Sequence, residues 1–379
     1  MISSINSLYN VLNSSSFYLL SFLIIMSIIV FVHEYGHYII AKLCNVKIEV
    51  FSIGFGPELF GINDKSGTRW KFSLIPLGGY VKMLGDDGPS SATGSSSNLP
   101  ENEKSYAFCE KSLLQKSLIA FAGPFANLIF SLVLLTAFFN IHGILRHNST
   151  IGDVIENSAA ANAGLVAGDV ILEINGHHIR WFEQIKEYME KYAQDNELLI
   201  KYSRNKDIHI IKIKPTLKEI EGAFNNTKVK PFLGVVISNI PSNYESQKLT
   251  LGNSFIQSIN YTYLLSKSIL QVLGQILTGQ RSLNELGGPI RIAQYSGESV
   301  KQNQVLLCMA MISINLGIIN LLPIPMLDGG HIFQYLIQAI LRRKEVNPKY
   351  QRYAATIGLM LLLSLMIFVT FNDVRNIFK

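Results

Sequence analysis

Residues 17–42 read FYLLSFLIIMSIIVFVHEYGHYIIAK, and this stretch decides the fold class. It is uncharged from Phe17 to Val32, is interrupted by a polar cluster from His33 to His37, and is then apolar again until Lys42. A helix that crosses about 30 Å of hydrocarbon needs about 20 predominantly apolar residues. We therefore expect a membrane-spanning segment here, and the polar cluster within it requires an explanation.

The composition of the whole chain also indicates a membrane protein. Of its 379 residues, 48% are hydrophobic and only 16% are charged, and the mean hydropathy is +0.26. Soluble domains have about 25% charged residues, so an ordinary soluble protein is excluded, as is a disordered chain. Three further apolar blocks occur at 117–141, 302–327 and 353–371. We predict a polytopic α-helical membrane protein with four transmembrane helices.

Basic residues in short loops predict the orientation of these helices. The segments 43–111 and 332–352 contain many Lys and Arg residues, whereas residues 1–16 contain none. Both loops should be cytoplasmic, which places both termini and residues 142–301 on the outer side. A cleaved signal peptide is the alternative for the first segment, but a basic start and a small-residue cleavage site are missing. We assign the net charge of +6 to topology and lipid head groups rather than to nucleic acid.

The polar cluster contains an H-E-x-x-H motif formed by His33, Glu34 and His37. Residues four apart lie one turn apart on the same face of a helix, so both imidazoles can reach one metal ion. Glu34, on the neighbouring face, can then contact a water molecule at the metal. Ionisable groups at membrane depth are costly and usually serve a function. The alternative is a helix-end cluster that reaches the cytoplasmic surface near Lys42.

A catalytic zinc site has three protein ligands and one open position, so the motif lacks one ligand. The best candidate is Asp328, which precedes two glycines that let the backbone bend closely. His331 is the rival ligand, and a turn or helix-cap role is the alternative for Asp328. Pro323 and Pro325 break the helix just before it, and irregular backbone at membrane depth is tolerated where it lines a cavity. The three cysteines have no metal-ligand spacing and predict no disulfide framework.

Motifs in a fixed order run through most of the chain: HEYGH at 33–37, FSIGFGP at 51–57, PLGGYVKM at 76–83, AGPFAN at 122–127, LGGPI at 286–290 and NLGIINLLPIPMLDGGH at 315–331. Together they resemble the site-2 protease family of intramembrane zinc metalloproteases, in particular the bacterial regulator-of-sigma-E protease type. The resemblance implies one Zn²⁺ per chain, held by His33, His37 and Asp328. It further implies that Glu34 is the general base, that Asn320 helps to hold the substrate, and that the protein lies in the bacterial cytoplasmic membrane.

Residues 70–83, WKFSLIPLGGYVKM, predict a β-hairpin because their two halves have strand-like composition around Pro76 to Gly79. The resemblance implies a membrane-associated β-loop at this place on the cytoplasmic side. We expect a locally unwound substrate to add to the edge of this hairpin as another strand, in contact with Gly78, Gly79 and Tyr80. A soluble loop with an ordinary turn is the alternative.

One inserted α+β PDZ domain is expected in the exported part, at 143–236. Residues 160–176 resemble the pattern A-x-x-A-G-L-x-x-G-D-x-I-x-x-I-N-G of PDZ domains in bacterial proteases. Residues 232–235, FLGV, are expected to end the domain in the manner of a carboxylate-binding strand. One such domain is visible, whereas the better studied relatives carry two in tandem, and capture of a chain terminus and a plain structural cover remain open. His177 and His178 are predicted to be solvated turn residues.

Two other segments have distinct patterns. Residues 253–278 predict an amphipathic helix, either at the outer membrane interface or packed against the bundle. Residues 86–104, rich in Ser, Gly and Asn, predict a cytoplasmic linker. The predicted boundaries are 1–42 for the first transmembrane segment, 43–111 for the cytoplasmic loop, 112–142 for the second transmembrane segment, 143–236 for the PDZ domain, 237–301 for the exported amphipathic region, 302–331 for the third transmembrane segment, 332–352 for the second cytoplasmic loop and 353–373 for the fourth transmembrane segment.

The motifs and the resemblance predict a zinc-dependent endopeptidase that cuts peptide bonds within transmembrane segments of single-span proteins. The resemblance implies substrates such as anti-sigma factors or remnant signal peptides, and an upstream site-1-type protease as a partner. The alternative is a catalytically inactive membrane scaffold or a metal-sensing receptor of the same fold, against which the intact Glu34 argues. A metal transporter would need ionisable residues in several spans, and outside the first cluster and Asp328 the predicted spans have almost none.

Overall fold

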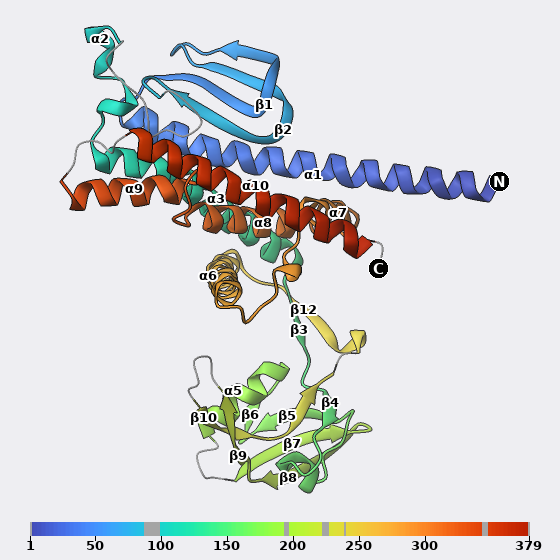
Figure 1. Cartoon of the computed structure of the whole chain (residues 1–379). Helices are drawn as coiled ribbons and strands as arrows, with labels where there is room; N and C mark the ends of the chain where they lie inside the picture. Colours follow the sequence, from blue (N-terminus) through green and yellow to red (C-terminus); the bar gives the residue numbers. More distant parts are fainter. Residues whose placement is uncertain are drawn as a thin grey trace. The chain divides into compact units, whose positions relative to one another are not determined.

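The computed structural model describes residues 2–86, 99–192, 197–221, 227–238, 240–342 and 348–377. The chain forms two compact units, one made of Met1–Phe138 with Leu251–Lys379 and the other of Phe139–Thr250. The first unit contains the long helices and a curved sheet, and the second is built mainly from short strands (Figure 1). The predicted linker falls largely on residues 87–98, which lie outside the described residues.

Three helices of the first unit are long and apolar enough to cross a membrane. They lie at the predicted segments 17–42, 117–141 and 353–371, so apolar helices at these places are confirmed. Their apolar parts are Ser16–Leu43, Leu113–His142 and Tyr353–Asn376. The full helices are α1 (Ile2–Leu43), α3 (Leu113–His142) and α10 (Pro348–Ile377).

The predicted third transmembrane segment is not one continuous helix. Its apolar part, α8 (Val305–Asn320), is shorter than the about 20 residues needed to span hydrocarbon. Pro323 and Pro325 follow, and proline lacks the N–H group that would continue the helical hydrogen bonds. The chain therefore runs irregularly over 321–327 before it enters α9 (Asp328–Ile340). Four membrane-spanning helices were expected, and three of the described helices are long and apolar enough to cross a membrane.

The strands β1 (Ile48–Asn63) and β2 (Arg69–Met83) form an antiparallel sheet that packs against α1 (Figure 1). Ile53 of β1 lies opposite both Phe72 and Gly79 of β2. The prediction that the two halves of residues 70–83 pair with each other is therefore wrong, because the halves flank β1 on its two sides. Across the sheet the order is 58–63, 69–73, 50–53 and 79–83, so residues 79–83 form an edge strand.

The carboxylate of Asp64 closes the turn between these strands. It accepts hydrogen bonds from the backbone N–H groups of Ser66 (2.8 Å) and Thr68 (2.9 Å) and from the indole N–H of Trp70 (3.1 Å). Burial alone would raise the pKa of Asp64, but the hydrogen bonds from Ser66, Trp70 and Thr68 hold it well below its usual range. The turn is therefore closed by an ionised side chain at neutral pH.

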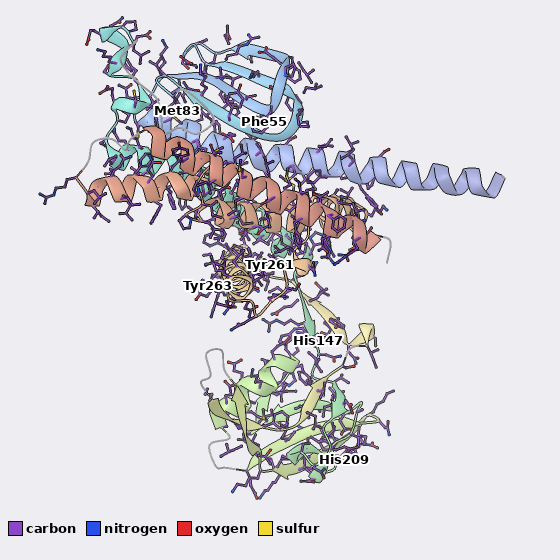
Figure 2. All side chains as sticks on the ribbon, viewed as in Figure 1. Phe55, Met83, His147, His209, Tyr261 and Tyr263 are labelled. Carbon is purple, nitrogen blue, oxygen red and sulfur yellow. The ribbon has the colours of Figure 1, made fainter. Side chains whose placement is uncertain are left out.

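The helix α6 (Leu251–Leu277) confirms the predicted amphipathic helix, but it buries its small polar residues. Ser254 and Ser258 are fully buried, and the Ser258 hydroxyl accepts a hydrogen bond from Thr136 of α3 at 3.0 Å. Many of its large apolar side chains are exposed, among them Phe255. Tyr263, which is labelled in Figure 2, is exposed as well. Helix α6 thus contacts the bundle through serines and presents apolar groups outward.

A carboxylate from α10 caps the helix α7 (Pro289–Lys301). Asp373 accepts hydrogen bonds from the backbone N–H groups of Gly288 (3.0 Å) and Arg291 (3.1 Å). Hydrogen bonds at the LGGPI motif therefore connect the start of α7 to the end of α10. The remaining short elements of this unit are α2 (Glu101–Lys104), η1 (Phe108–Glu110) and η3 (Leu283–Glu285).

The second unit has an apolar core between its helices and a four-stranded sheet of order β6-β5-β7-β8. Ile171, Ile174, Leu198 and Ile200 are fully buried in this core. The strand pairs β11-β4, β12-β3 and β10-β9 complete the unit. Its elements are β3 (Ile144–His147), β4 (Ile151–Val154), α4 (Ala159–Asn162), β5 (Val170–Ile174), β6 (His177–His178), α5 (Phe182–Tyr192), β7 (Leu198–Arg204), β8 (Asp207–Ile213), β9 (Thr216–Glu221), β10 (Thr227–Phe232), β11 (Val235–Ile237), η2 (Pro241–Asn243) and β12 (Tyr244–Gln247).

The predicted motif at 160–176 folds as helix, turn and strand around Asp169. This carboxylate is fully buried, accepts the backbone N–H of Val166 at 2.9 Å, and receives two hydrogen bonds from Arg204 at 2.7 and 2.8 Å. Burial would raise the pKa of Asp169, but the Arg204 guanidinium and the Val166 N–H hold it below its usual value. The Gly168-Asp169 pair of the motif is thus a structural anchor of this unit.

Candidate metal centre

Two histidines of α1 face the same point inside the first unit. His33 and His37 lie one helical turn apart, and their Nε2 atoms are 3.2 Å from each other. Only 7% and 9% of their surfaces are exposed. Gly36 lets α3 come close, because a Cβ atom on it would lie 2.7 Å from Cβ of Ala126. The structure therefore has both imidazoles together, as their spacing predicts.

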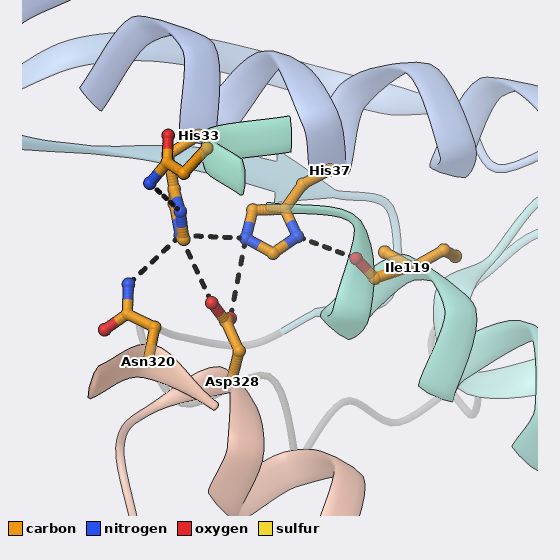
Figure 3. Close-up of polar contacts among 6 residues, drawn as sticks. His33, His37, Ile119, Asn320 and Asp328 are labelled. Carbon is orange, nitrogen blue, oxygen red and sulfur yellow. Dashed lines mark hydrogen bonds and ion pairs between the residues drawn. The ribbon is translucent and has the colours of Figure 1, made fainter. Parts of the chain in front are cut away.

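The carboxylate of Asp328, the first residue of α9, faces both imidazoles (Figure 3). Its Oδ2 lies 3.2 Å from Nε2 of His33, and its Oδ1 lies 3.5 Å from Nε2 of His37. Side chains on Gly329 and Gly330 would collide with the backbone of the irregular stretch before α9. The two glycines thus let the chain turn tightly enough to present Asp328.

The three side chains have the arrangement of ligands to a single metal ion. Their ligand atoms all lie within 4.8 Å of one another. Four tetrahedral ligands, each about 2.0–2.1 Å from a zinc ion, lie about 3.3 Å from one another. The separation of 3.2 Å between the two Nε2 atoms and that of 3.2 Å between Nε2 of His33 and Oδ2 of Asp328 agree with this value, and the other carboxylate oxygen, Oδ1, lies 3.5 Å from Nε2 of His37. Two imidazoles and one carboxylate are also a donor set of catalytic zinc sites, so the residues present fit this metal.

The backbone carbonyl of Ile119 fixes the position of the proton on His37. Nδ1 of His37 lies 2.7 Å from this oxygen (Figure 3). A carbonyl oxygen only accepts hydrogen bonds, so Nδ1 carries a hydrogen, and in the neutral ring Nε2 then presents its lone pair. This lone pair points toward His33 and Asp328. A neutral imidazole with a free lone pair on one nitrogen is the form that binds metals.

Two amide side chains lie next to His33. Nδ2 of Asn320, at the end of α8, is 3.5 Å from Nε2 of His33 (Figure 3). Nδ2 of Asn127, on α3, is 3.2 Å from Nδ1 of the same ring. Asn320 was expected near the metal from the resemblance, and the structure places its amide next to His33. Asn127 belongs to the AGPFAN motif, but the sequence analysis gave it no role.

Gly123, also on α3, has a role that the sequence analysis missed. A Cβ atom at this position would lie 2.6 Å from Cε1 of His37 and 2.9 Å from Cε1 of His33. Any residue other than glycine would therefore displace one of the two rings. Gly123 and Asn127 are four residues apart, so the gap and the amide lie on one face of α3. That G-x-x-x-N spacing within the AGPFAN motif is the signal that could have identified them.

Glu34 lies beside the edge strand of the sheet. A Cβ atom on Gly79 would be 2.9 Å from Cγ of Glu34, so the strand packs directly on this side chain. Tyr80 stacks on Phe55 with ring centroids 6.2 Å apart, and Gly78 packs against the same ring. The structure thus places Gly79, with Gly78 and Tyr80 on either side of it in the strand, at the position of Glu34.

The remaining histidines that the sequence analysis considered lie outside this group. His331 follows Asp328 by one turn of α9, and its Nδ1 is buried without a hydrogen-bond partner among the described residues. It is not a member of the group of three donors. His177 and His178 are exposed in β6, directly after the turn, and no metal-type group within the described ranges includes them.

Comparison with known proteins identifies the family. The model for peptidase family M50 matches residues 21–365. The chain belongs to peptidase family M50. This M50 chain is therefore a metalloprotease, and its apolar helices make it a membrane protein. All three donors and Glu34 lie within the matched region.

Similar proteins occur in several bacteria, and each carries the name "Putative zinc metalloprotease". The M50 chain is 34% identical to one from Agrobacterium fabrum over 95% of its own length and 96% of the relative. It is 37% identical to one from Rickettsia conorii over 95% and 99%, and 36% identical to one from Campylobacter jejuni over 95% and 95%. A solved PDZ domain of the SdrC-like protein from Listeria monocytogenes covers 24% of the chain and 87% of that domain, at 21% identity and a TM-score of 0.20.

Proposed function

We propose that the chain is a zinc-dependent intramembrane endopeptidase in which His33, His37 and Asp328 hold the metal. The observation that carries the proposal is the convergence of two imidazoles and one carboxylate, 3.2 to 3.5 Å apart, from helices at opposite ends of the chain. His33 lies about 15 Å along α1 from its end at Leu43, given the rise per residue of a helix. This position is inside the apolar part of α1, which supports cleavage at membrane depth.

The proposed chemistry divides the work between the metal and Glu34. When bound, Zn²⁺ supplies a Lewis acid that lowers the pKa of a water molecule toward about 7 and polarises the scissile carbonyl. The Glu34 carboxylate takes a proton from the attacking water and delivers it to the nitrogen of the leaving peptide. The hydrogen bond from Nδ1–H of His37 to the Ile119 carbonyl orients this ring so that its Nε2 faces the metal position. Packing of Gly79 against Glu34 excludes bulk water from one side of the base.

A substrate helix has to unwind before its carbonyls can react, and in hydrocarbon the freed backbone groups need new partners. The edge strand 79–83 offers them, because no other described strand pairs with its outer side. A substrate segment that added there would run past Glu34, which packs on Gly79. We assign Gly78, Gly79 and Tyr80 to substrate contact for this reason. The amide of Asn320, close to His33, would hold a substrate carbonyl.

The proposed substrates are single-span proteins of the bacterial cytoplasmic membrane, trimmed on the outside by another protease, or remnant signal peptides. The basic loops 43–111 and 332–352 would be cytoplasmic, and residues 142–301 would be exported. The exposed apolar residues of α6 fit a helix at the outer membrane interface. The exported unit would meet the outer part of a substrate, either as a size filter or by binding a chain terminus.

The variant Glu34→Gln tests the proposed base. In proteoliposomes that contain a single-span model substrate, we expect cleavage to fall at least about a hundredfold while bound zinc is retained, because a general base contributes about 10²–10⁴ in rate. Glu298→Gln, the same chemical change at an exposed position on α7, is the control and should cleave normally. Cleavage by Glu34→Gln at the rate of the native protein would remove the assigned base. A mapped cut outside the apolar segment of the substrate would contradict intramembrane cleavage.

A further inference from the structure

The two imidazoles of the metal centre are supported unequally. Nδ1 of His37 has the backbone carbonyl of Ile119 as its partner, and this group can only accept. Nδ1 of His33 lies next to a side-chain amide, that of Asn127, at 3.2 Å. An amide can either donate or accept, so it leaves two tautomers of His33 open.

Metal binding allows only one of these tautomers. Nε2 of His33 is the atom that faces His37 and Asp328, at 3.2 Å in each case. If Nε2 gives its lone pair to the metal, the neutral ring must carry its hydrogen on Nδ1. That N–H group is buried with the rest of His33, and a buried donor without an acceptor loses the hydrogen bond that it made to water. An acceptor is therefore required at the place of the Asn127 amide.

The orientation of the Asn127 amide permits this. Its Oδ1 atom is buried and makes no hydrogen bond among the described residues. The oxygen and nitrogen ends of an amide have nearly the same shape, so the surrounding hydrogen bonds determine which end faces a partner. Exchanging the two ends sacrifices no hydrogen bond of Oδ1 and places an acceptor 3.2 Å from Nδ1 of His33.

The surroundings also hold the amide in place. Asn127 is fully buried, and its backbone carbonyl accepts a hydrogen bond from the Ser313 hydroxyl of α8 at 2.9 Å. Gly317 of α8 packs against its side chain, since a Cβ atom there would lie 3.5 Å from Cβ of Asn127. The amide is thus fixed between α3 and α8 at the distance that His33 needs.

We infer that Asn127 is a positioning residue whose Oδ1 accepts the Nδ1 hydrogen of His33 and so selects the tautomer that binds the metal. Asn127 does for His33 what the Ile119 carbonyl does for His37. The inference rests on the proposed function in one respect, namely that His33 is a metal ligand. Partners of this kind fix the orientation and basicity of ligand histidines, and their loss weakens metal binding about 10- to 100-fold.

Zinc affinity of the full-length protein, measured by competition with a chromogenic chelator, tests this inference without any cleavage assay. Asn127→Leu keeps the size of the side chain but removes the acceptor, and we expect the Kd for zinc to rise about 10- to 100-fold. Asn127→Asp provides an acceptor that cannot donate when ionised, and it should bind zinc within about threefold of the native protein. Rescue by Asp separates positioning from packing, because both variants change the same buried position.

Ser131→Ala is the matched control, since Ser131 is also fully buried on α3 and, among the described residues, its hydroxyl bonds only to the carbonyl of Leu128 in its own helix. It should leave zinc affinity unchanged. The inference is overturned if Asn127→Leu binds zinc as tightly as the native protein, or if Asn127→Asp binds no better than Asn127→Leu. Should Asn127→Leu fail to fold, weak binding by Asn127→Asp alone overturns it. Undiminished zinc binding by His37→Ala would instead mean that the metal centre itself is misassigned.

Discussion

The two units of the chain place their apolar residues in opposite ways. The second unit buries Ile171 and Leu198 completely, as water-soluble domains do. The first unit exposes large apolar side chains such as Leu20 (59%) and Met360 (67%), while Ser131 and Ser313 are fully buried. The difference follows from the surrounding solvent, because lipid tails are as apolar as leucine and burial of leucine gains little there.

The comparison explains how a polar centre can exist at membrane depth. Helices that are not held by the hydrophobic effect associate through close packing of small residues and through hydrogen bonds between helices. Gly36 and Gly123 bring α1 and α3 together around the two histidines, and Gly317 brings α8 to Asn127. The candidate metal centre of the first unit thus depends on glycines that leave room for close helix packing, whereas the core of the second unit depends on closely packed apolar side chains.

The largest effect is expected when a side chain is added at Gly123, next to the two histidine rings. Gly123→Ala places a methyl group within 2.9 Å of both histidine rings, so one ring must move. We expect zinc affinity to fall more than about a hundredfold, since a ligand itself is displaced rather than its support. Equilibrium zinc binding to the purified full-length protein measures this.

Gly274→Ala is the matched control for that variant. Gly274 lies in α6, and a Cβ atom there would meet nothing within 4 Å. The substitution should leave zinc binding intact and stabilise the helix by about 1 kcal/mol at most. Equal zinc affinities of the two variants would show that the close approach of α3 to the histidines is not required.

The second-largest effect is expected when a buried side chain is shortened in the core of the second unit. Leu198→Ala creates a cavity in a fully buried core and should lower the free energy of unfolding of this unit by about 2–5 kcal/mol. Leu20→Ala, on the exposed side of α1, should change stability by less than about 0.5 kcal/mol. Pulse proteolysis of the full-length protein in urea measures both. A larger loss for Leu20→Ala than for Leu198→Ala would reverse the comparison.

The sequence predicted local geometry well and long-range geometry poorly. The four-residue spacing of His33 and His37 is sufficient to place both imidazoles on one helix face. Nothing local could bring Asp328 to them, and that assignment depended on the need for a third ligand and on the resemblance to a family. Gly123 was missed because its contribution is the absence of a side chain.

The irregular parts of the fold were predicted only in part. The break at Pro323 and Pro325 was predicted, and α8 stops at Asn320, but the length of the apolar block did not show that the remaining helix is too short to span a membrane. The halves of β2 have strand composition, yet composition does not reveal that both pair with β1 rather than with each other. Register and partner choice depend on contacts between distant segments.

A smaller effect is expected for the charged anchor of the second unit. Asp169→Asn should lower the free energy of unfolding by about 1–3 kcal/mol at pH 7, because the two hydrogen bonds from Arg204 lose their charged acceptor. The pKa of Asp169 is lowered in the folded unit, so its stabilisation is complete above the unfolded value of about 3.9 and is lost as the pH falls through the folded value. The difference in stability between the native protein and the variant should therefore begin to shrink below about pH 4 and vanish once the pH lies below the folded pKa. A difference that grows on acidification would contradict this assignment.

The smallest effect is expected for a hydrogen bond between membrane helices. Ser258→Ala removes the acceptor of the Thr136 hydroxyl at the contact of α3 and α6. Such bonds contribute about 0.6 kcal/mol on average. The single hydroxyl hydrogen of Thr136 can also bond to the carbonyl of Leu132 in its own helix, which limits the contribution further. A double-mutant cycle with Thr136→Val measures the coupling. A coupling above about 2 kcal/mol would show that polar contacts, rather than close packing, hold this unit together.

The central claim is that a carboxylate from α9 completes a metal site begun by two histidines of α1. The most direct test is the zinc content of the purified protein and of the variants Asp328→Ala and His331→Ala, determined by elemental mass spectrometry. We predict one zinc per chain in the native protein and in His331→Ala, and less than about a tenth of that in Asp328→Ala. Full zinc content in Asp328→Ala, together with its loss in His331→Ala, would contradict the account.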